Sequence, residues 1–231
     1  MNSSWIDVAA ADQGSFKAYL SLPPAGKGPG IVLIQEIFGV NEHIRAVADQ
    51  YAMDGYCVLA PDVFWRQQPR VDLGYSEEDM GKGFAIMHKV DFAQAVQDLA
   101  ATVKALRALP ACSGKVATLG YCMGGLLSYL SAANAGVDAA VVYYPGGIAD
   151  QLGLAEKITC PILFHLAGDD QYIPPATIAA MQKAFEGRAG AAVHVYPGAH
   201  HGFNCWVRPS YEQRAAALAH GLSLAFLASS L

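Results

Sequence analysis

The chain has 231 residues, of which 53% are hydrophobic and 15% are charged, and its formal net charge is -5 at pH 7. A chain of this length and apolar content can bury one large core, so we expect a single domain over residues 1–231. No run of Lys and Arg forms the basic stripe that binding to a phosphate backbone requires, which argues against a nucleic-acid partner. No segment reaches the ~18 uninterrupted apolar residues of a membrane span, and the first residues lack the apolar region of a signal peptide. We therefore expect no membrane association and a cytoplasmic location.

Short β-type runs alternate with helical patterns, and this alternation predicts a mostly parallel sheet with helices on both faces. The first strand that the pattern predicts is GIVLIQE, at 30–36, a continuous apolar run typical of a strand buried on both faces. A helix is expected to follow, with Asn41 as its N-cap and Gly55 at its end. The next strand is expected at 56–62, and the stretch 63–83 has no clear period, which predicts a long surface loop.

The second half of the chain continues the alternation. Apolar residues from Phe92 to Leu106 recur at helical spacing, which predicts a helix that stops before Pro110. The later elements are strands at 138–144, 160–168 and 192–198, a helix starting at Pro174 or Pro175, and a last helix with Tyr211, Ala215, Leu218, Leu222 and Phe226 on one face.

The hexapeptide GYCMGG, at 120–125, joins the strand KVATLG to a helical pattern. At such a sharp turn the central side chain is thrust above the sheet, and the small residues Gly120 and Gly124 let strand and helix approach closely. The turn also lies at a helix N-terminus, where free N–H groups favour an anion such as a thiolate. Cys122 is therefore a candidate nucleophile. The alternative is a small buried thiol without reactivity.

An acid and then a histidine follow the nucleophile in folds with this turn, each just past a strand end. Here the chain offers Asp169 and Asp170 after one expected strand, and His200 and His201 after the next. The order, the strand context and the residue types all favour a hydrolase. The alternative for these side chains is a turn-forming aspartate and a capping histidine.

The segments IVLIQEIFGVN, GYCMGG, AGDDQYIPP and AHHGF, in this order, resemble the dienelactone hydrolases (carboxymethylenebutenolidases) of the α/β-hydrolase superfamily. The resemblance runs over nearly the whole chain. It implies the α/β-hydrolase fold, a small-molecule lactone or ester as substrate, and no metal or organic cofactor. It also implies a triad of Cys122, Asp170 and His201, because Asp170 precedes the family's polar-aromatic pair and His201 begins its His-small-Phe motif.

The same resemblance assigns roles around the cysteine. The family's glutamate at the position of Glu36 contacts the cysteine in the resting enzyme, where a carboxylate would oppose ionisation of the thiol and accept its S–H. The backbone N–H groups of Ile37 and Met123 are the expected oxyanion donors. Three aromatic residues match pocket positions of the family, although core packing would explain each equally well: Phe38, Phe84 and Tyr144.

The chain departs from the family where two arginines would grip a substrate carboxylate. The first region holds no arginine, and Cys205 stands at the second position. Lys82 and Arg208 are the nearest cations, and we expect both to be solvated surface residues. The missing arginines favour an alternative substrate class, small-acyl esters or thioesters, over dienelactone.

Five scattered cysteines without CxxC pairs are expected to be reduced thiols. A second alternative is therefore a redox-responsive thiol protein in which Cys205 resolves a sulfenic acid on Cys122. A non-catalytic binding protein of the same fold is a third. A monomer or a weak homo-oligomer is expected.

Overall fold

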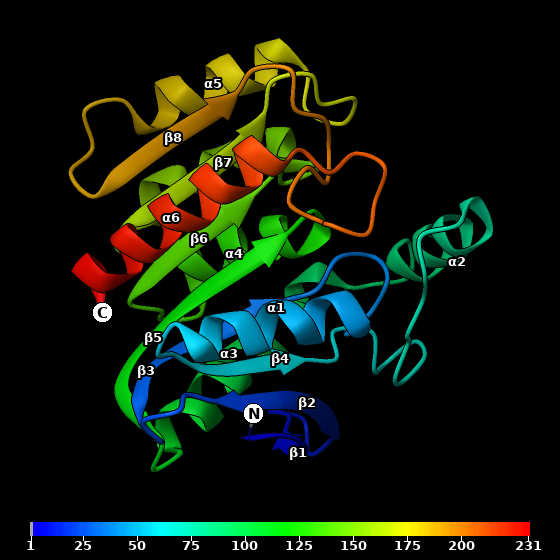
Figure 1. Cartoon of the computed structure of the whole chain (residues 1–231), viewed down its shortest axis with the longest axis vertical. Helices are drawn as coiled ribbons and strands as arrows, with labels where there is room; N and C mark the ends of the chain where they lie inside the picture. The colour runs from blue at the N-terminus through cyan, green and yellow to red at the C-terminus, as the bar shows by residue number, and fades with distance from the viewer. Residues whose placement is uncertain (1) are drawn as a thin grey trace.

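The computed structural model describes residues 2–231 (Figure 1). Its strands are β1 (Asn2–Ala9), β2 (Ser15–Leu22), β3 (Gly28–Ile34), β4 (Cys57–Pro61), β5 (Cys112–Tyr121), β6 (Ala139–Tyr143), β7 (Ile162–Ala167) and β8 (Ala191–Tyr196). The helices are α1 (Glu42–Met53), α2 (Glu77–Met87), α3 (Phe92–Ala108), α4 (Met123–Asn134), the 3₁₀ segment η1 (Ile148–Lys157), α5 (Pro175–Phe185) and α6 (Gln213–Ser230).

One eight-stranded sheet joins the strands in the order β1-β2-β4-β3-β5-β6-β7-β8. The six strands β3 to β8 run parallel to one another, whereas β1 and β2 are antiparallel to their neighbours. Helices α1 and α6 cover the face toward the viewer in Figure 1, and α3 and α4 cover the opposite face. The expected α/β architecture, a mostly parallel sheet with helices on both faces, is confirmed.

The central strands are apolar throughout because helices bury them on both faces. Residues 30–34 of β3 and 116–121 of β5 are all buried, and each fully buried aliphatic side chain contributes about 1.5–3 kcal/mol. The edge strand β1 is mostly exposed and polar. Strand β1 therefore has no continuous apolar run, and such runs are the signal that predicted the inner strands.

The stretch 63–83 is not one long loop, because α2 begins at Glu77. The Oγ of Ser76 accepts a hydrogen bond from the backbone N–H of Asp79 at 3.1 Å, and three acidic residues fill the first turn of the helix. Both features stabilise a helix N-terminus. Glycines in the sequence obscured this helix, and Gly83 has a packing reason: a Cβ there would lie 2.6 Å from the carbonyl oxygen of Ile37.

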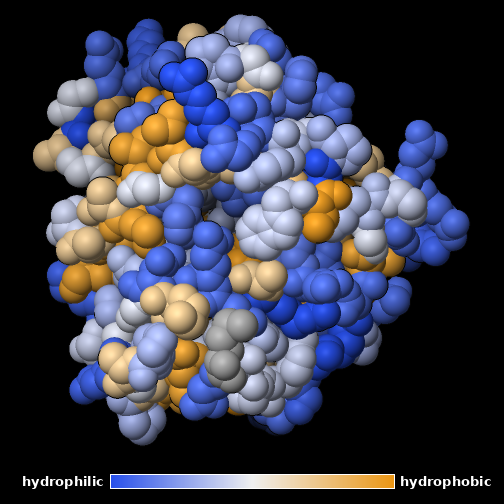
Figure 2. Space-filling view, viewed as in Figure 1, coloured by the Kyte–Doolittle hydropathy of each residue, from blue (hydrophilic) through white to orange (hydrophobic). Residues whose placement is uncertain are grey.

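Helix α6 does not bury the whole face that its larger residues suggest. Leu218 and Leu222 are 51% and 37% exposed, and Figure 2 shows hydrophobic side chains gathered over this helix. The buried positions hold Ala215, Ala219 and Ser223 instead. Small side chains let the helix approach the sheet, where the Oγ of Ser223 bonds the hydroxyl of Tyr143 at 2.8 Å.

The direction in which strands are added to the sheet reverses at β3 and β5. From β3 the chain passes through α1 to β4 on one side, and β5 then pairs with β3 on the other side. Ligands of open α/β sheets bind outside the carboxyl ends of the strands at such a reversal. The segments carrying Glu36 and Cys122 leave the sheet at this point, since Ile34 of β3 pairs with Gly120 of β5. No helix within residues 2–231 is both long and apolar enough to cross a membrane.

Candidate active site

Cys122 stands on the turn between β5 and α4, in a conformation that L-residues rarely adopt, with φ 57° and ψ -119°. Its backbone N–H donates to the carbonyl of Tyr143 at 3.1 Å, and its carbonyl accepts from the N–H of Leu126 at 3.1 Å. The turn is thus held by β6 on one side and by the first turn of α4 on the other. The strained residue at the helix N-terminus is the one that the hexapeptide motif singles out.

Glycine is required around this turn because backbone passes very close to it. A Cβ on Gly120 would lie 2.0 Å from the carbonyl oxygen of Gly124, and a Cβ on Gly124 would lie 2.3 Å from that of Ile34. No side chain fits at such distances. The expectation that Gly120 and Gly124 permit the close approach of strand and helix is confirmed.

His201 and Asp170 meet from the loops after β8 and β7. Nδ1 of His201 lies 2.8 Å from Oδ2 and 3.1 Å from Oδ1 of Asp170. The Oδ1 atom also accepts a hydrogen bond from the backbone N–H of Tyr172 at 2.8 Å. The Asp170 side chain is fully buried and that of His201 is 5% exposed. The carboxylate therefore fixes the orientation of the imidazole and makes Nδ1 its proton-bearing nitrogen.

The other ring nitrogen of His201, Nε2, is buried and has no hydrogen-bond partner among the residues that the structure describes. His201 and Cys122 line the same cavity. Burial alone would lower the pKa of His201, but a negative charge on Cys122 and the Asp170 carboxylate would outweigh it and raise the pKa to about 10. The imidazole of His201 therefore keeps its proton when the sulfur of Cys122 is negatively charged.

The neighbouring pair takes no part in this arrangement. Asp169 and His200 are exposed, and Nδ1 of His200 lies 3.0 Å from the backbone carbonyl oxygen of Asp169. Of the two acids and two histidines that the sequence offers, the buried pair is Asp170 and His201.

Glu36 is 1% exposed and lies on the loop after β3. Its Oε1 accepts a hydrogen bond from a guanidinium N–H of Arg208 at 3.1 Å, whereas its Oε2 is left without a partner by the described residues. Burial raises the pKa of the Glu36 carboxyl, and the positive charges of Arg208 and His201 oppose that rise. The partner found for this carboxylate is Arg208, in place of the thiol contact that the family resemblance implies.

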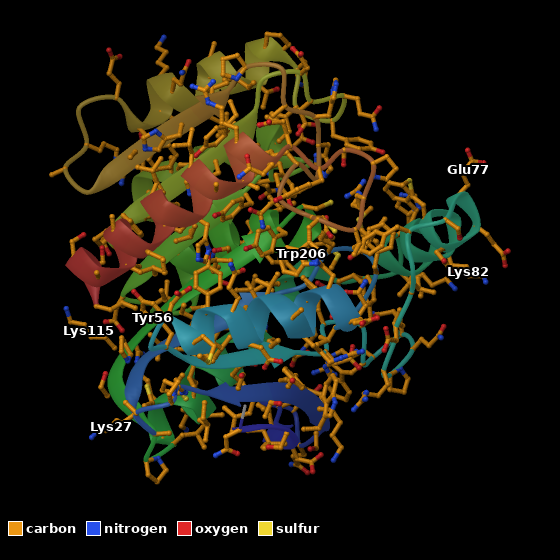
Figure 3. The ribbon with its side chains drawn as sticks, in the orientation of Figure 1. Lys27, Tyr56, Glu77, Lys82, Lys115 and Trp206 are labelled. Carbon is orange, nitrogen blue, oxygen red and sulfur yellow. The ribbon has the colours of Figure 1, made fainter. Side chains whose placement is uncertain are left out.

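The expectation that Arg208 is a solvated surface residue is wrong. Its side chain is only 12% exposed, and its guanidinium lies over the ring of Phe38 with 5.7 Å between Cζ and the ring centroid. Gly202 makes room for it, because a Cβ there would lie 2.4 Å from Nη1 of Arg208. Lys82, in contrast, is on the outside of α2 (Figure 3) and pairs with Glu78 at 2.6 Å with 54% of its side chain exposed.

A cavity of about 310 Å³ opens in front of the cysteine and the histidine. Its walls are mostly apolar and come from α2, α3, α4 and three loops. The lining residues are Phe84, Met87, Phe92, Cys122, Met123, Leu126, Gly146, Gly147, Tyr172 and His201. Of the three aromatic residues that the resemblance assigned to the pocket, Phe84 lies in this wall. Phe38 and Tyr144 are 2% and 1% exposed and pack in the core.

The backbone N–H groups of Ile37 and Met123 are the expected oxyanion donors. Outside the helices and strands, the backbone hydrogen bonds found within residues 2–231 include none donated by Ile37 or Met123. Met123 is the first residue of α4, where an N–H has no acceptor within the helix. Both groups are thus free to donate to a ligand oxygen.

All five cysteines are free thiols, as expected. Cys205 is fully buried, and burial raises the pKa of its thiol to about 12. Within residues 2–231, no group of three or more His, Cys, Asp and Glu side chains is arranged to bind a metal ion.

Sequence reasoning missed two residues of the site. Arg208 could not be assigned because its reach to Glu36 spans 172 positions in the chain. Tyr172 is 42% exposed, and its ring packs edge-on against that of His201 with centroids 4.8 Å apart. The one sequence signal for Tyr172 was its position two residues after Asp170.

Comparisons with known proteins identify the family and the fold. A model of the dienelactone hydrolase family matches residues 16–231. A candidate carboxymethylenebutenolidase of Azospirillum brasilense is 36% identical over 96% of both chains. The carboxymethylenebutenolidase of Pseudomonas putida is 34% identical over 99% of this chain and 97% of the relative. A candidate dienelactone hydrolase from Klebsiella pneumoniae subsp. pneumoniae, 28% identical, superimposes with a TM-score of 0.86 over 98% of both chains. The chain therefore belongs to the dienelactone hydrolase family and is a carboxylic ester hydrolase with the α/β-hydrolase fold.

Proposed function

We propose that this protein hydrolyses lactones or small esters through a triad of Cys122, His201 and Asp170 and a covalent acyl-enzyme. One observation carries the proposal: the strained cysteine and the Asp170-bound histidine line the same cavity. These residues leave the sheet at β5, β7 and β8, so only the fold brings them together.

In the first step the Cys122 thiolate attacks the ester carbonyl carbon, and the Sγ–C bond forms while the carbonyl oxygen becomes an oxyanion. The free N–H groups of Ile37 and Met123 are the proposed donors to this oxygen. When the tetrahedral intermediate collapses, the C–O bond to the leaving group breaks and His201 gives its Nε2 proton to the leaving oxygen. His201 then takes a proton from water, hydroxide displaces the sulfur, and the acid leaves.

The electrostatics of His201 support both halves of this cycle. Although burial opposes it, a negative charge on Cys122 and the Asp170 carboxylate raise the pKa of His201 to about 10, so the imidazole is protonated at neutral pH whenever the sulfur is ionised. Once the sulfur is acylated it carries no charge, and one of the two anions that hold the proton on the imidazole is lost. A weaker hold on the proton suits the change from general acid to general base.

Glu36 is a second carboxylate close enough to His201 for the two charges to interact. Burial raises the pKa of Glu36, and the charge of His201 opposes that rise. Arg208 balances that carboxylate in the resting enzyme. We propose that Glu36 limits ionisation of Cys122 before substrate binds, and that Arg208 keeps Glu36 ionised in its buried position. Both are positioning residues in this scheme.

The walls of the cavity favour a neutral ester over a carboxylate-bearing dienelactone. The lining residues include no Lys or Arg among those described. Lys82 is paired with Glu78 in solvent, and Arg208 is engaged by Glu36. This specific observation supports the second candidate, a small-acyl carboxylesterase or thioesterase that uses the same triad.

The redox alternative finds little support. A resolving thiol has to ionise and reach its partner, whereas Cys205 is fully buried and its pKa is raised to about 12.

Mass spectrometry after brief exposure to p-nitrophenyl acetate tests the proposal directly. We expect one acetyl group on the peptide that contains Cys122, and neither adduct nor turnover in Cys122→Ala. Cys160→Ala is the matched control, because Cys160 is a half-buried thiol that is not among the residues lining the cavity, and it should keep both. Turnover that persists in Cys122→Ala would contradict the mechanism.

A further inference from the structure

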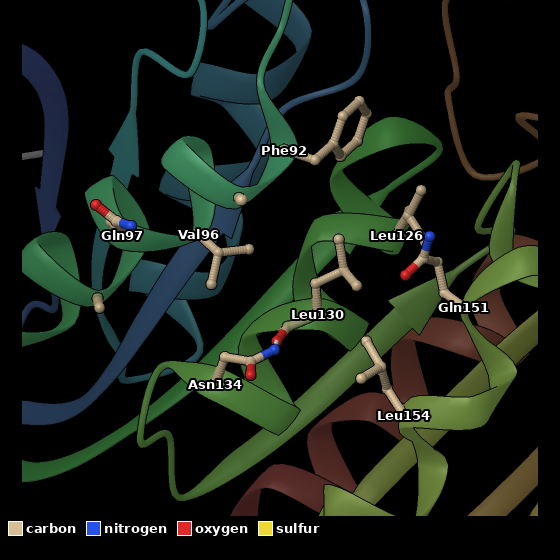
Figure 4. Close-up of a pocket in the computed structure, with 10 residues that line it drawn as sticks. Phe92, Val96, Gln97, Leu126, Leu130, Asn134, Gln151 and Leu154 are labelled. Atoms are coloured by element: carbon tan, nitrogen blue, oxygen red, sulfur yellow. Dashed lines mark hydrogen bonds between the residues drawn. The ribbon is translucent and has the colours of Figure 1, made fainter.

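A second and larger cavity adjoins the one at the cysteine. It measures about 730 Å³ and runs between α3, α4 and η1. Phe92 and Leu126 line both cavities, so the two meet at these side chains. Figure 4 shows Val96 and Gln97 on one side of the groove, Leu130 on its floor, and Gln151 and Leu154 on the other side.

One row of side chains links the groove to the sulfur. Cys122, Leu126, Leu130 and Asn134 are four residues apart, so they follow one face of α4. Each step advances about 6 Å along a helix that rises 1.5 Å per residue. The row therefore leads from the cysteine down the length of the groove. Phe92, Val96 and Ala100 form the corresponding row on the facing side of α3.

The chemistry of the groove suits an apolar chain. Of the described residues that line it, none is charged, and the polar ones are the amides Gln97, Asn134 and Gln151. Val96, Leu126 and Leu130 are each 8% exposed. A chain laid along them would remove its own apolar surface from water, and that burial is the main favourable contribution to binding.

The direction of the reaction decides which end of the substrate enters the groove. The leaving oxygen has to face His201, which comes from the loop after β8. The α3 wall of the groove, which begins at Phe92, packs on β3, β4 and β5, whereas the loop that carries His201 leaves β8 at the far edge of the sheet. The part of the substrate that stays on the sulfur therefore points toward the groove.

We infer that the groove between α3, α4 and η1 binds the neutral apolar acyl chain of the ester that Cys122 cleaves. The inference rests on the proposed function and extends it, from small esters to esters whose acyl group carries an aliphatic or aryl tail. The catalytic cavity holds the ester group, and the groove holds the tail.

A series of p-nitrophenyl esters from acetate to decanoate, each kept below its micelle-forming concentration, tests the inference. We expect kcat/KM to rise at least tenfold from butyrate to decanoate. In Leu154→Glu, which places a charge in the groove, the decanoate-to-butyrate ratio of kcat/KM should fall at least tenfold. Leu218→Glu is the matched control: Leu218 is 51% exposed on α6, outside the groove, and the ratio should stay at its original value.

Gln151→Glu provides a second test with almost no change in shape, and it should lower the same ratio. Equal kcat/KM for butyrate and decanoate in the unmodified protein would overturn the inference, as would an unchanged ratio in both groove variants. A gain that appears with longer alcohols in acetate esters, and not with longer acyl groups, would also overturn it. In each of these cases acetate turnover and the Cys122 adduct would persist, whereas failure of the proposed function would remove both.

Discussion

Replacing Arg208 by Met would break the buried ion pair with Glu36 and leave a carboxylate that is 1% exposed without its counter-charge. Loss of one partner of a buried ion pair costs about 3–5 kcal/mol of unfolding free energy. Because Arg208 is itself 12% exposed, we expect the lower end, about 3 kcal/mol, at pH 8.

The loss should depend on pH with a defined sign. Burial already raises the pKa of Glu36 above its ordinary 4.5, and removing Arg208 removes the largest opposing charge. A carboxyl whose pKa is higher in the folded state binds more protons when folded, so its stability deficit grows as pH rises from 4.5 to the folded pKa. At pH values below the folded pKa, Glu36 takes up a proton, and the remaining cost is about 1 kcal/mol for a lost hydrogen bond.

Urea unfolding followed by tryptophan fluorescence at pH 5 and pH 8 measures both values. Glu36→Gln combined with Arg208→Met should recover most of the loss at pH 8 and show no such pH dependence. Lys82→Met, which breaks the exposed pair with Glu78, is the control and should leave stability unchanged at both pH values. An equal loss at both pH values in Arg208→Met, or no recovery in the double variant, would refute the reasoning.

Three further predictions concern the triad and its turn. Asp170→Asn should lower kcat by a factor on the order of 10³–10⁴ by favouring the wrong tautomer of His201, with the fold retained by circular dichroism; a loss below tenfold would contradict the assignment. His201→Gln should slow iodoacetamide alkylation of Cys122 at pH 7 at least tenfold, because the imidazolium partner is gone, and an unchanged rate would argue against the ion pair. Gly124→Ala should cost about 3 kcal/mol or more of unfolding free energy, since its Cβ would lie 2.3 Å from a carbonyl oxygen. Gly153→Ala, where no atom lies within 4 Å, should stay within about 0.5 kcal/mol, and equal losses in the two variants would show that the close approach is not the cause.

The local chemistry of the chain was sufficient to predict much of the fold. The continuous apolar runs of the inner strands predicted a sheet buried on both faces, and Asn41 was recognisable as an N-cap, which the 3.1 Å bond from the N–H of Ile44 confirms. Strands β1 and β2, helix α2 and the 3₁₀ segment η1 were missed. The sequences of β1 and α2 are polar or contain glycine and carry no apolar period, and their structure depends on pairing and capping.

The turn at Cys122 was also predictable, because glycine spacing expresses a backbone constraint that acts between neighbours in the chain. The choice of Asp170 over Asp169 and of His201 over His200 rested on family resemblance. In the structure, burial separates the members of each pair: one of each lies inside the site and the other lies in solvent.

The sequence by itself determined the alternation of inner strands and helices, the turn that carries Cys122, and the residue types available beside it. Only the tertiary structure decided that Arg208 reaches Glu36, that Phe38 and Tyr144 pack in the core, and that a groove extends from the cysteine along α4. The physical reason is that local propensities act over a few residues. Ion pairing, burial and cavity shape depend on segments that meet only after the sheet has assembled.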